Sequence, residues 1–158
     1  MVALLAFGMQ LVAIFAPLGA DAPRRILIVC SYLLLLLFVA ANRRRPGLVI
    51  LGLGLFLNLL PIFANGGLMP VTPETLDRAH ISRADVQPGD WIRNSKDVLK
   101  QREDAHLWFL SDRLVWADLP GFRVFSIGDL FIAGGLLVTL GDLFLPRLKT
   151  VRPHRPAT

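Results

Sequence analysis

Long apolar stretches alternate with short polar connections along most of the chain. Four ranges are nearly free of charge: residues 2–20, 26–42, 47–64 and 127–145. Each is about 17 to 20 residues long, the length that a helix needs to cross roughly 30 Å of hydrocarbon. Apolar positions do not alternate with a period of two, so barrel strands are disfavoured. The pattern predicts an all-α integral membrane bundle of about four transmembrane helices, forming a single membrane domain over residues 1–158.

A polar segment over residues 65–125 separates the third and fourth apolar stretches, and residues 146–158 form a polar tail. The polar segment carries eight basic and nine acidic residues, so it is close to neutral. With spans on both sides of it, the segment must lie on one face of the membrane. We expect it to form a helical or irregular cap over the ends of the spans.

Turn and capping residues predict only short elements at the start of this cap. Asn65-Gly66-Gly67 follows Pro61 closely and ends the third span. Thr72-Pro73-Glu74 combines a capping residue, a proline at the first helical position and an early acid, which predicts a short helix to about Ala79. Ser82 to Asp85 repeats the capping-box spacing, but Pro88-Gly89 closes any helix within about two turns.

The second half of the cap becomes more apolar than an exposed segment should be. Residues 95–103 are good helix formers, and the chain then turns apolar through Leu107–Leu110 and Leu114–Trp116. The polar residues in this stretch do not share one arc of a helical wheel. We expect the stretch to pack over the ends of the spans at headgroup depth, where Trp108 and Trp116 bury their rings and keep their N–H groups in water.

Basic residues in the short connections predict the orientation. Three arginines, Arg43 to Arg45, lie between the second and third stretches, and the tail adds four basic residues, whereas only Arg24 and Arg25 lie in the first connection. The excess of basic residues predicts that both termini are cytoplasmic and that residues 65–125 are extracytoplasmic. Anionic lipid headgroups at the cytoplasmic basic loops are the expected partner of the net charge of +5, and nucleic acid is not.

Two features of the first half of the chain restrict its processing and redox chemistry. Ala20-Asp21-Ala22 has the form of a signal-peptidase site, but Pro23 follows it and nothing basic precedes Val2, so we expect the first stretch to remain as a span. The single cysteine, Cys30, lies inside the second stretch. No disulfide within the chain can therefore stabilise the cap.

Three polar side chains, Gln10, Ser31 and Asn58, interrupt the apolar stretches at similar predicted depths. Polar groups in hydrocarbon normally face the interior of a bundle. Hydrogen bonds between helices are the simpler role for this layer, and a polar site for a small solute is the alternative. The absence of an ionisable partner in the layer disfavours an ion pathway.

The fourth stretch begins with Ser126-Ile127-Gly128-Asp129, which has the spacing of a capping box. Asp129 would then lie at the positive end of the helix dipole, so its expected role is structural. Asp142 lies near the opposite end, where Arg147, Lys149 or the Arg43–Arg45 loop would neutralise it. An enzymatic alternative requires Asp118, Asp129 and His106 to gather at the outer membrane interface.

The sequence contains none of the zinc, phosphate-loop or nucleophile-elbow motifs that we sought, and it implies no cofactor. Asp77, His80 and Asp85 have a spacing that would suit a metal only weakly, and no metal is expected. Gly52, Gly54, Gly134 and Gly135 would permit close approach of helices, although there is no strict Gly-x-x-x-Gly motif. A homo-oligomer or a membrane protein partner is left open.

Two motifs carry a resemblance to a known family. Asn65-Gly66-Gly67-Leu68-Met69-Pro70-Val71 and the later Ser126-Ile127-Gly128-Asp129 resemble a family of small bacterial membrane proteins catalogued as domain of unknown function 5317. Its members have apolar spans, an Asn-Gly-Gly-x-Met-Pro turn, an outer segment with a Leu-x-Asp element and a closing Ser-x-Gly-Asp helix. Asp118 matches the middle acid. The resemblance implies a bacterial cell membrane and no particular activity.

Our leading hypothesis is a non-enzymatic multi-pass membrane protein whose cap binds a protein or a lipid headgroup. The candidate binding residues are those of the two motifs and the middle acid: Asn65, Gly66, Gly67, Met69, Pro70, Asp118, Ser126, Gly128 and Asp129. The first alternative is a small-solute transporter or channel subunit that uses Gln10, Ser31 and Asn58. The second is the membrane enzyme with carboxylates at its outer interface.

Overall fold

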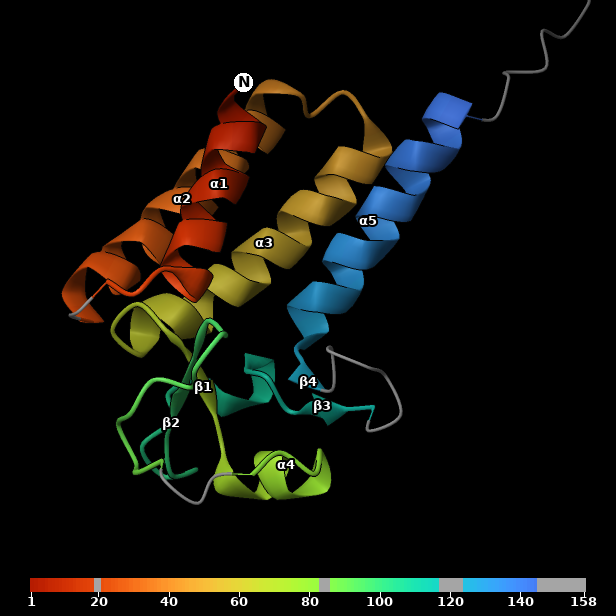
Figure 1. The fold of residues 1–158 in the computed structure, drawn as a ribbon. Helices are drawn as coiled ribbons and strands as arrows, with labels where there is room; N and C mark the ends of the chain where they lie inside the picture. Colours follow the sequence, from red (N-terminus) through yellow and green to blue (C-terminus); the bar gives the residue numbers. More distant parts are fainter. Residues whose placement is uncertain (19–20, 83–85, 117–123, 145–158) are drawn as a thin grey trace, which may run out of the picture.

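The computed structural model describes residues 1–18, 21–82, 86–116 and 124–144, and this part is mostly helical (Figure 1). Four long helices pack one against the next in the order α1, α2, α3 and α5. Their bounds are α1 Val2–Phe15, α2 Asp21–Ala41, α3 Pro46–Ala64 and α5 Ile127–Phe144. The helical class predicted from the apolar stretches is confirmed.

Within the described residues, three helices are long and apolar enough to cross a membrane: α2, α3 and α5. The helix in the first apolar stretch is shorter than predicted: α1 ends at Phe15 and has 14 residues. At 1.5 Å per residue it is about 21 Å long, less than the roughly 30 Å of hydrocarbon. Pro17 explains the early end, since the residue before a proline is pushed out of the helical region, and Ala16 is extended with ψ 142°.

The second stretch differs from prediction at its start. Helix α2 begins at Asp21, so Arg24 and Arg25 lie in the helix and not in a connection. Asp21 supports this earlier start, because an acid in the first turn interacts favourably with the helix dipole. The predicted starts of α3 and α5 are each within one residue of those observed.

Helices α3 and α5 run antiparallel and approach each other through glycines. A Cβ atom on Gly47 would lie 2.4 Å from the Thr139 Oγ1 atom, and one on Gly54 would lie 2.5 Å from the Gly128 carbonyl oxygen. Side chains at these positions would therefore separate the backbones. Of the four glycines singled out in the sequence, Gly54 and Gly135 lie in this contact.

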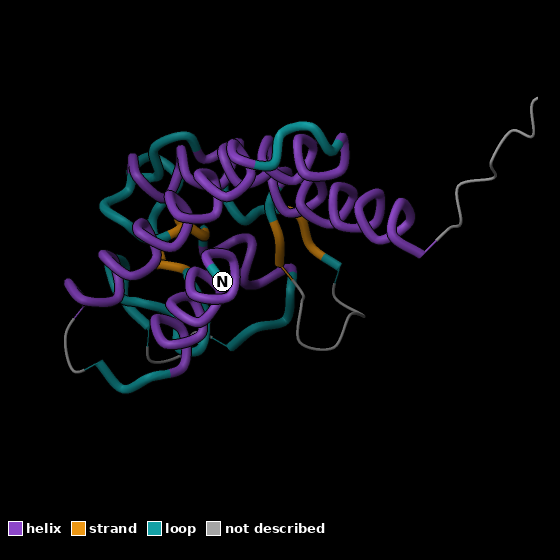
Figure 2. The backbone as a smooth tube through the Cα atoms, turned by 90° about the horizontal axis from the view of Figure 1, so that it is seen from above, coloured by secondary structure: helices purple, strands orange, loops and turns teal. Residues whose placement is uncertain are grey.

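The cap lies at one end of the long helices and is mostly loop (Figure 2). Two short strands, β1 Met69–Val71 and β2 Asp97–Leu99, pair in parallel, and β3 Leu114–Val115 pairs antiparallel with β4 Val124–Phe125. Helix α4, Pro73–Arg78, begins as predicted, with the Thr72 hydroxyl accepting a hydrogen bond from the Thr75 N–H. A 3-10 turn, η1, spans Trp108–Leu110.

The helix favoured by composition over residues 95–103 does not form. Strand β2 lies there instead, because Val98 and Leu99 are buried against β1 and neighbouring cap residues. Leu68, Met69 and Val98 share one hydrophobic core with Ile28, Tyr32, Leu55 and Ile62 of the long helices. The cap is therefore packed onto the helix ends, although these three cap residues lie outside the stretch from Leu107 to Trp116 for which the packing was predicted. The second predicted capping box, at Ser82–Asp85, lies largely outside the described residues.

Candidate functional site

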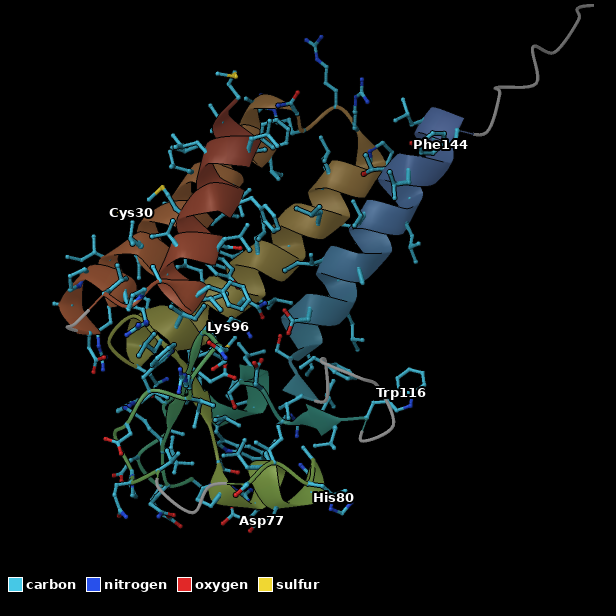
Figure 3. The ribbon with its side chains drawn as sticks, in the orientation of Figure 1. Cys30, Asp77, His80, Lys96, Trp116 and Phe144 are labelled. Carbon is cyan, nitrogen blue, oxygen red and sulfur yellow. The ribbon has the colours of Figure 1, made fainter. Side chains whose placement is uncertain are left out.

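Charged and polar side chains meet where the cap contacts α3 and α5. We call six of them the junction cluster: Asn58, Lys96, Asp97, Asp112, Ser126 and Asp129. Figure 3 labels Lys96, which lies between the cap-side ends of the long helices and the rest of the cap. Asn58, Asp112 and Ser126 are each 2% exposed or less, so this is a polar site inside the protein.

The helix side of the cluster is built on the capping box at the start of α5. The Asp129 N–H donates to the Ser126 hydroxyl at 3.0 Å, and the Ser126 N–H donates to the Asp129 carboxylate at 2.9 Å. The spacing from Ser126 to Asp129 therefore forms the capping box predicted from sequence. Asn58 on α3 completes the arrangement: its amide donates to Asp129 at 2.7 Å, and its carbonyl accepts from Ser126 at 2.6 Å.

The cap side of the cluster centres on the Lys96 ammonium. Its Nζ atom donates to the Asp112 carboxylate at 2.5 Å and lies 3.8 Å from Asp97 and 4.0 Å from Asp129. Main-chain pairing holds these groups in place, since the Lys96 carbonyl accepts from the Met69 N–H and Asp112 forms a bridge with Val71. One lysine from the cap thus reaches a carboxylate at the start of a membrane-length helix.

The cluster contains more acids than bases. Burial opposes the charge on Lys96, but the carboxylates of Asp112, Asp97 and Asp129 outweigh burial and raise the pKa of Lys96 well above its usual value. Burial also raises the pKa of Asp112. Lys96 opposes this shift, whereas the carboxylates of Asp97 and Asp129 raise the pKa of Asp112 further. One ammonium cannot neutralise three nearby carboxylates, so Asp112 holds its proton more tightly than an exposed acid does.

A second set of contacts fixes the cap to the end of α3 through Asn65. Its amide donates to the carbonyls of Pro61 and His106, both at 2.8 Å. Its carbonyl accepts from the His106 N–H at 3.1 Å and from the Lys100 ammonium at 3.2 Å. Asn65 is 4% exposed and fully engaged, so it ties the chain before η1 to α3.

Arg24 joins α1, α2 and the cap. Its Nε atom donates to the Ala13 carbonyl at 2.8 Å, and its guanidinium lies 3.6 Å above the centre of the Trp91 ring. Arg24 is 5% exposed, which is unusual for arginine and is compensated here by the ring and the carbonyl. Arg24 therefore links α2 to α1 and to the cap.

Glycines allow close approaches at two places: between Asn58 and α5, and at the turn that follows α3. A Cβ on Gly128 would lie 2.2 Å from the Asn58 Oδ1 atom, so the contact between Asn58 and α5 depends on glycine there. Gly67 has φ +98°, and a Cβ on it would lie 2.8 Å from the Arg25 Cβ. Gly66 has φ +79°, and its carbonyl accepts from Arg25 at 2.9 Å. The Asn-Gly-Gly turn thus brings α2 against the end of α3.

Residues 1–140 match the model of a family of unknown function, DUF5317. The chain belongs to this family. Neither a curated protein nor a solved structure matches the chain. The predicted family is confirmed. In the structure, Asn65 of the first motif and Ser126 and Asp129 of the second lie where the cap meets the helices.

Most of the predicted motif residues in this DUF5317 chain are internal. Leu68, Met69, Pro70 and Val71 are buried, so they form the core of the cap and offer no surface to a partner. Asp118 lies outside the described residues. His106 is exposed, and its backbone contacts Asn65.

The predicted layer of three polar residues does not form one hydrogen-bonded network. Ser31 is buried, and its hydroxyl donates to the Ile28 carbonyl of its own helix at 2.7 Å. Gln10 is partly exposed and makes no side-chain hydrogen bond within the described residues. Only Asn58 joins other predicted site residues, and its partners are Ser126 and Asp129 on α5.

Lys96, Asp97 and Asp112 were missed by the sequence analysis. A signal existed for Asp112, since Leu110-Ser111-Asp112 places an acid directly after an apolar run. Nothing local pairs Lys96 with Asp112, which is 16 residues away. Their meeting depends on the pairing of β1 with β2.

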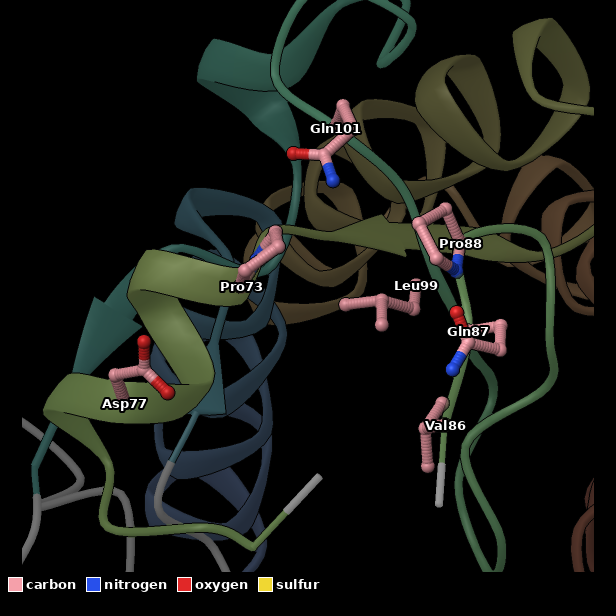
Figure 4. Close-up of a pocket in the computed structure, with 7 residues that line it drawn as sticks. All are labelled: Pro73, Asp77, Val86, Gln87, Pro88, Leu99 and Gln101. Atoms are coloured by element: carbon pink, nitrogen blue, oxygen red, sulfur yellow. The ribbon is translucent and has the colours of Figure 1, made fainter. Parts of the chain in front are cut away.

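A hollow of about 530 Å³ lies in the cap, away from the junction cluster (Figure 4). It is lined by Pro73, Asp77, Val86, Gln87, Pro88, Leu99 and Gln101. Asp77 is its only ionisable lining residue in the described part of the chain. Figure 3 places Asp77 and His80 at the end of the cap away from the long helices. No three His, Cys, Asp or Glu side chains among the described residues are grouped to hold a metal ion.

Proposed function

We propose that this chain is a non-enzymatic multi-pass protein of the bacterial cell membrane whose extracytoplasmic cap binds the headgroups of outer-leaflet lipids. The observation that carries the proposal is a group of aromatic and basic side chains on the cap. The Trp108 ring has the Arg102 guanidinium 4.0 Å and the Arg113 guanidinium 5.3 Å from its centre. Trp116 is 57% exposed and Phe109 is 48% exposed.

These residue types suit the boundary between lipid and water. Tryptophan concentrates at headgroup depth, because its ring is apolar and its N–H needs a polar partner. Arginine supplies planar donors that match phosphate oxygens. The rigid seating of the cap on α3 and α5 supports this role, since the junction cluster holds the aromatic groups at a fixed height relative to the helix ends.

Two further observations support the orientation and the non-enzymatic role. Arg43, Arg44 and Arg45 are exposed in the α2–α3 connection, at the end of the helices away from the cap, which favours a cytoplasmic position for that loop. Asp129 is engaged by Asn58 and Ser126 within the protein, which favours a structural role over a reactive one.

Fluorescence quenching tests the lipid proposal directly. Chains with a single tryptophan at 91, 108 or 116, the others replaced by phenylalanine, would be placed in nanodiscs that contain lipid spin-labelled either at the headgroup or deep in the acyl chain. We expect the headgroup label to quench Trp116 and Trp108 more strongly than the deep label does. Trp91, which stacks on Arg24, serves as the internal control. If only aqueous iodide quenched Trp116 and Trp108, the cap would face water or a protein partner, and lipid binding would be refuted.

A second candidate function, proton-linked transport of a small solute, is favoured by one observation. Asn58, the deepest polar group of the cluster, bonds to Asp129, which lies 4.0 Å from Lys96. Asp129 and Lys96 supply ionisable groups of the kind that a proton pathway requires. In vesicles loaded with a pH-sensitive dye, an imposed pH gradient should then decay faster with the native chain than with Asp112→Asn. Equal decay for both chains would remove this candidate.

A further inference from the structure

An apolar groove of about 320 Å³ runs between α2 and α3 directly below the cap. Its walls are Val29 and Leu33 on α2, with Phe56, Leu59, Leu60, Phe63 and Ala64 on α3, and Leu107 of the cap closes one end. The lining is almost entirely apolar. The groove is therefore an open channel along two membrane-length helices, with a roof that belongs to the cap.

The size and direction of the groove match one hydrocarbon chain. From Arg25 to Leu33 the helix rises about 12 Å, and one leaflet of hydrocarbon is about 15 Å deep. Phe56 and Phe63, two turns apart on α3, are 49% and 74% exposed and form one ridge. A straight chain laid in the groove beside this ridge would run along α2 and α3.

A cation lies at the cap end of the groove. Arg25, Val29 and Leu33 are spaced four residues apart, so they share one face of α2, with Arg25 nearest the cap. The Arg25 side chain is 31% exposed, and one of its nitrogens bonds to the Gly66 carbonyl, two residues beyond Ala64. The nearby acid is Asp21, whose carboxylate oxygen lies 4.0 Å from a terminal nitrogen of Arg25 and whose side chain is 51% exposed. This distant contact leaves Arg25 with N–H groups to donate.

A second cation reinforces the positive charge at this end. The Lys100 ammonium lies 3.2 Å from the Asn65 side chain, and Asn65 directly follows Ala64 in the chain. The backbone of His106, next to the roof residue Leu107, is held by the same asparagine. The Lys100 ammonium of the cap is thus held beside the mouth of the groove by partly buried hydrogen bonds to Asn65.

We propose that this groove is a specific site for an outer-leaflet phospholipid, with one acyl chain along α2 and α3 and the phosphate on Arg25. The site rests on the proposed function and specifies its ligand class. Lipid tails are as apolar as the groove, so transfer of the chain from the bilayer adds little by the hydrophobic effect. Selectivity must come from the fit under Leu107 and from the charge-assisted hydrogen bonds between arginine and phosphate.

Photo-crosslinking in nanodiscs tests the site with the full chain. The probes are phosphatidylglycerol and diacylglycerol, each carrying a diazirine midway along one acyl chain, so that they differ in the phosphate-bearing headgroup. We expect phosphatidylglycerol to label groove residues at least fivefold more than diacylglycerol does. A tenfold excess of unlabelled phosphatidylglycerol should remove most of this labelling.

Two groove-filling variants and a matched control separate this site from ordinary lipid contact. Ala64→Phe and Leu33→Trp, both at exposed positions, should each abolish groove labelling. Leu137→Phe, at a position on α5 where the native leucine is 70% exposed, should leave it unchanged. Arg25→Gln should reduce the preference for phosphatidylglycerol to near parity with diacylglycerol. Thermal unfolding of each variant would confirm that the fold persists.

Four outcomes would overturn the site. Labelling that excess lipid does not displace, and that falls equally on α5, would indicate bulk lipid. Equal labelling by both probes would refute the phosphate contact. A co-purified peptide that blocks lipid labelling of the groove would identify a protein occupant. If labelling failed while headgroup quenching of Trp116 persisted, only the groove proposal would fall, and the proposed function would stand.

Discussion

Replacing Gly135 by alanine tests the close contact between α3 and α5. A Cβ at this position would lie 2.3 Å from the Leu51 nitrogen and 2.6 Å from the Gly47 carbonyl oxygen. Both obstacles are backbone atoms, so no side chain can rotate away to make room. The nearer contact must lengthen by about 1.1 Å to reach the 3.4 Å at which ordinary contact begins.

Separating the helices by this distance has a definite cost. A gap of about 1 Å forfeits up to half of the dispersion energy between the facing atoms. Overpacking of this kind typically costs about 1–3 kcal/mol. The adjacent Gly134 is the matched control, since a Cβ there would meet nothing within 4 Å. Gly134→Ala should be neutral or stabilise the helix by up to about 1 kcal/mol.

We therefore expect the two alanine variants to differ in unfolding free energy by about 3 kcal/mol, with Gly135→Ala the less stable. The assay is reversible unfolding in mixed micelles with increasing sodium dodecyl sulfate, followed by far-ultraviolet circular dichroism. Hydrogen exchange of the Ser126 amide should also quicken in Gly135→Ala, because Asp129, which accepts from this amide, would lose the hydrogen bond from Asn58 as α3 moves away from α5. Equal unfolding midpoints for the two variants would refute the glycine-mediated packing.

Three further predictions concern the junction cluster. Lys96→Met should destabilise the chain by about 3 kcal/mol, because it leaves buried carboxylates without a cation, and adding Asp112→Asn should restore part of this loss in the same unfolding assay. Folding raises the pKa of Lys96, so the stability that Lys96 contributes should be complete below pH about 10.5 and decline at higher pH. A native chain that loses no more stability than Lys96→Met between pH about 9 and about 12 would contradict this. Asn58→Leu should lower the unfolding free energy by about 2 kcal/mol, because Ser126 and Asp129 lose a buried partner. The control Gln10→Leu should change it by less than about 0.5 kcal/mol. Similar losses for the two variants would argue against the hydrogen bonds described for Asn58.

The sequence was informative wherever a feature depends on neighbouring residues. The lengths of α3 and α5, and the end of α2, follow from the bounds of the apolar runs. The capping box at Ser126 and the helix N-cap at Thr72 both follow from spacings of three residues. The early end of α1 was predictable in principle from Pro17, but the apolar residues beyond it extended the predicted span to residue 20.

Features that depend on distant pairing could not be predicted. Val98 and Leu99 are buried because they meet β1, and the sequence around them, rich in Lys, Gln and Glu, favours a helix when considered alone. Asn58 was identified as a buried polar group, but its partners lie 68 and 71 residues away. The depth estimate grouped it with Gln10 and Ser31, because depth along a span says nothing about the face on which a side chain lies.

The central claim is that α2, α3 and α5 cross the membrane and hold the cap on one side, with the Arg43–Arg45 loop on the other. Cysteine labelling tests it in whole cells and inside-out vesicles, in a Cys30→Ser background. Asn94→Cys in the cap and Arg44→Cys in the loop are the two reporters. We predict that a membrane-impermeant maleimide labels position 94 only in whole cells and position 44 only in inside-out vesicles. Labelling of both positions from the same side would contradict the account.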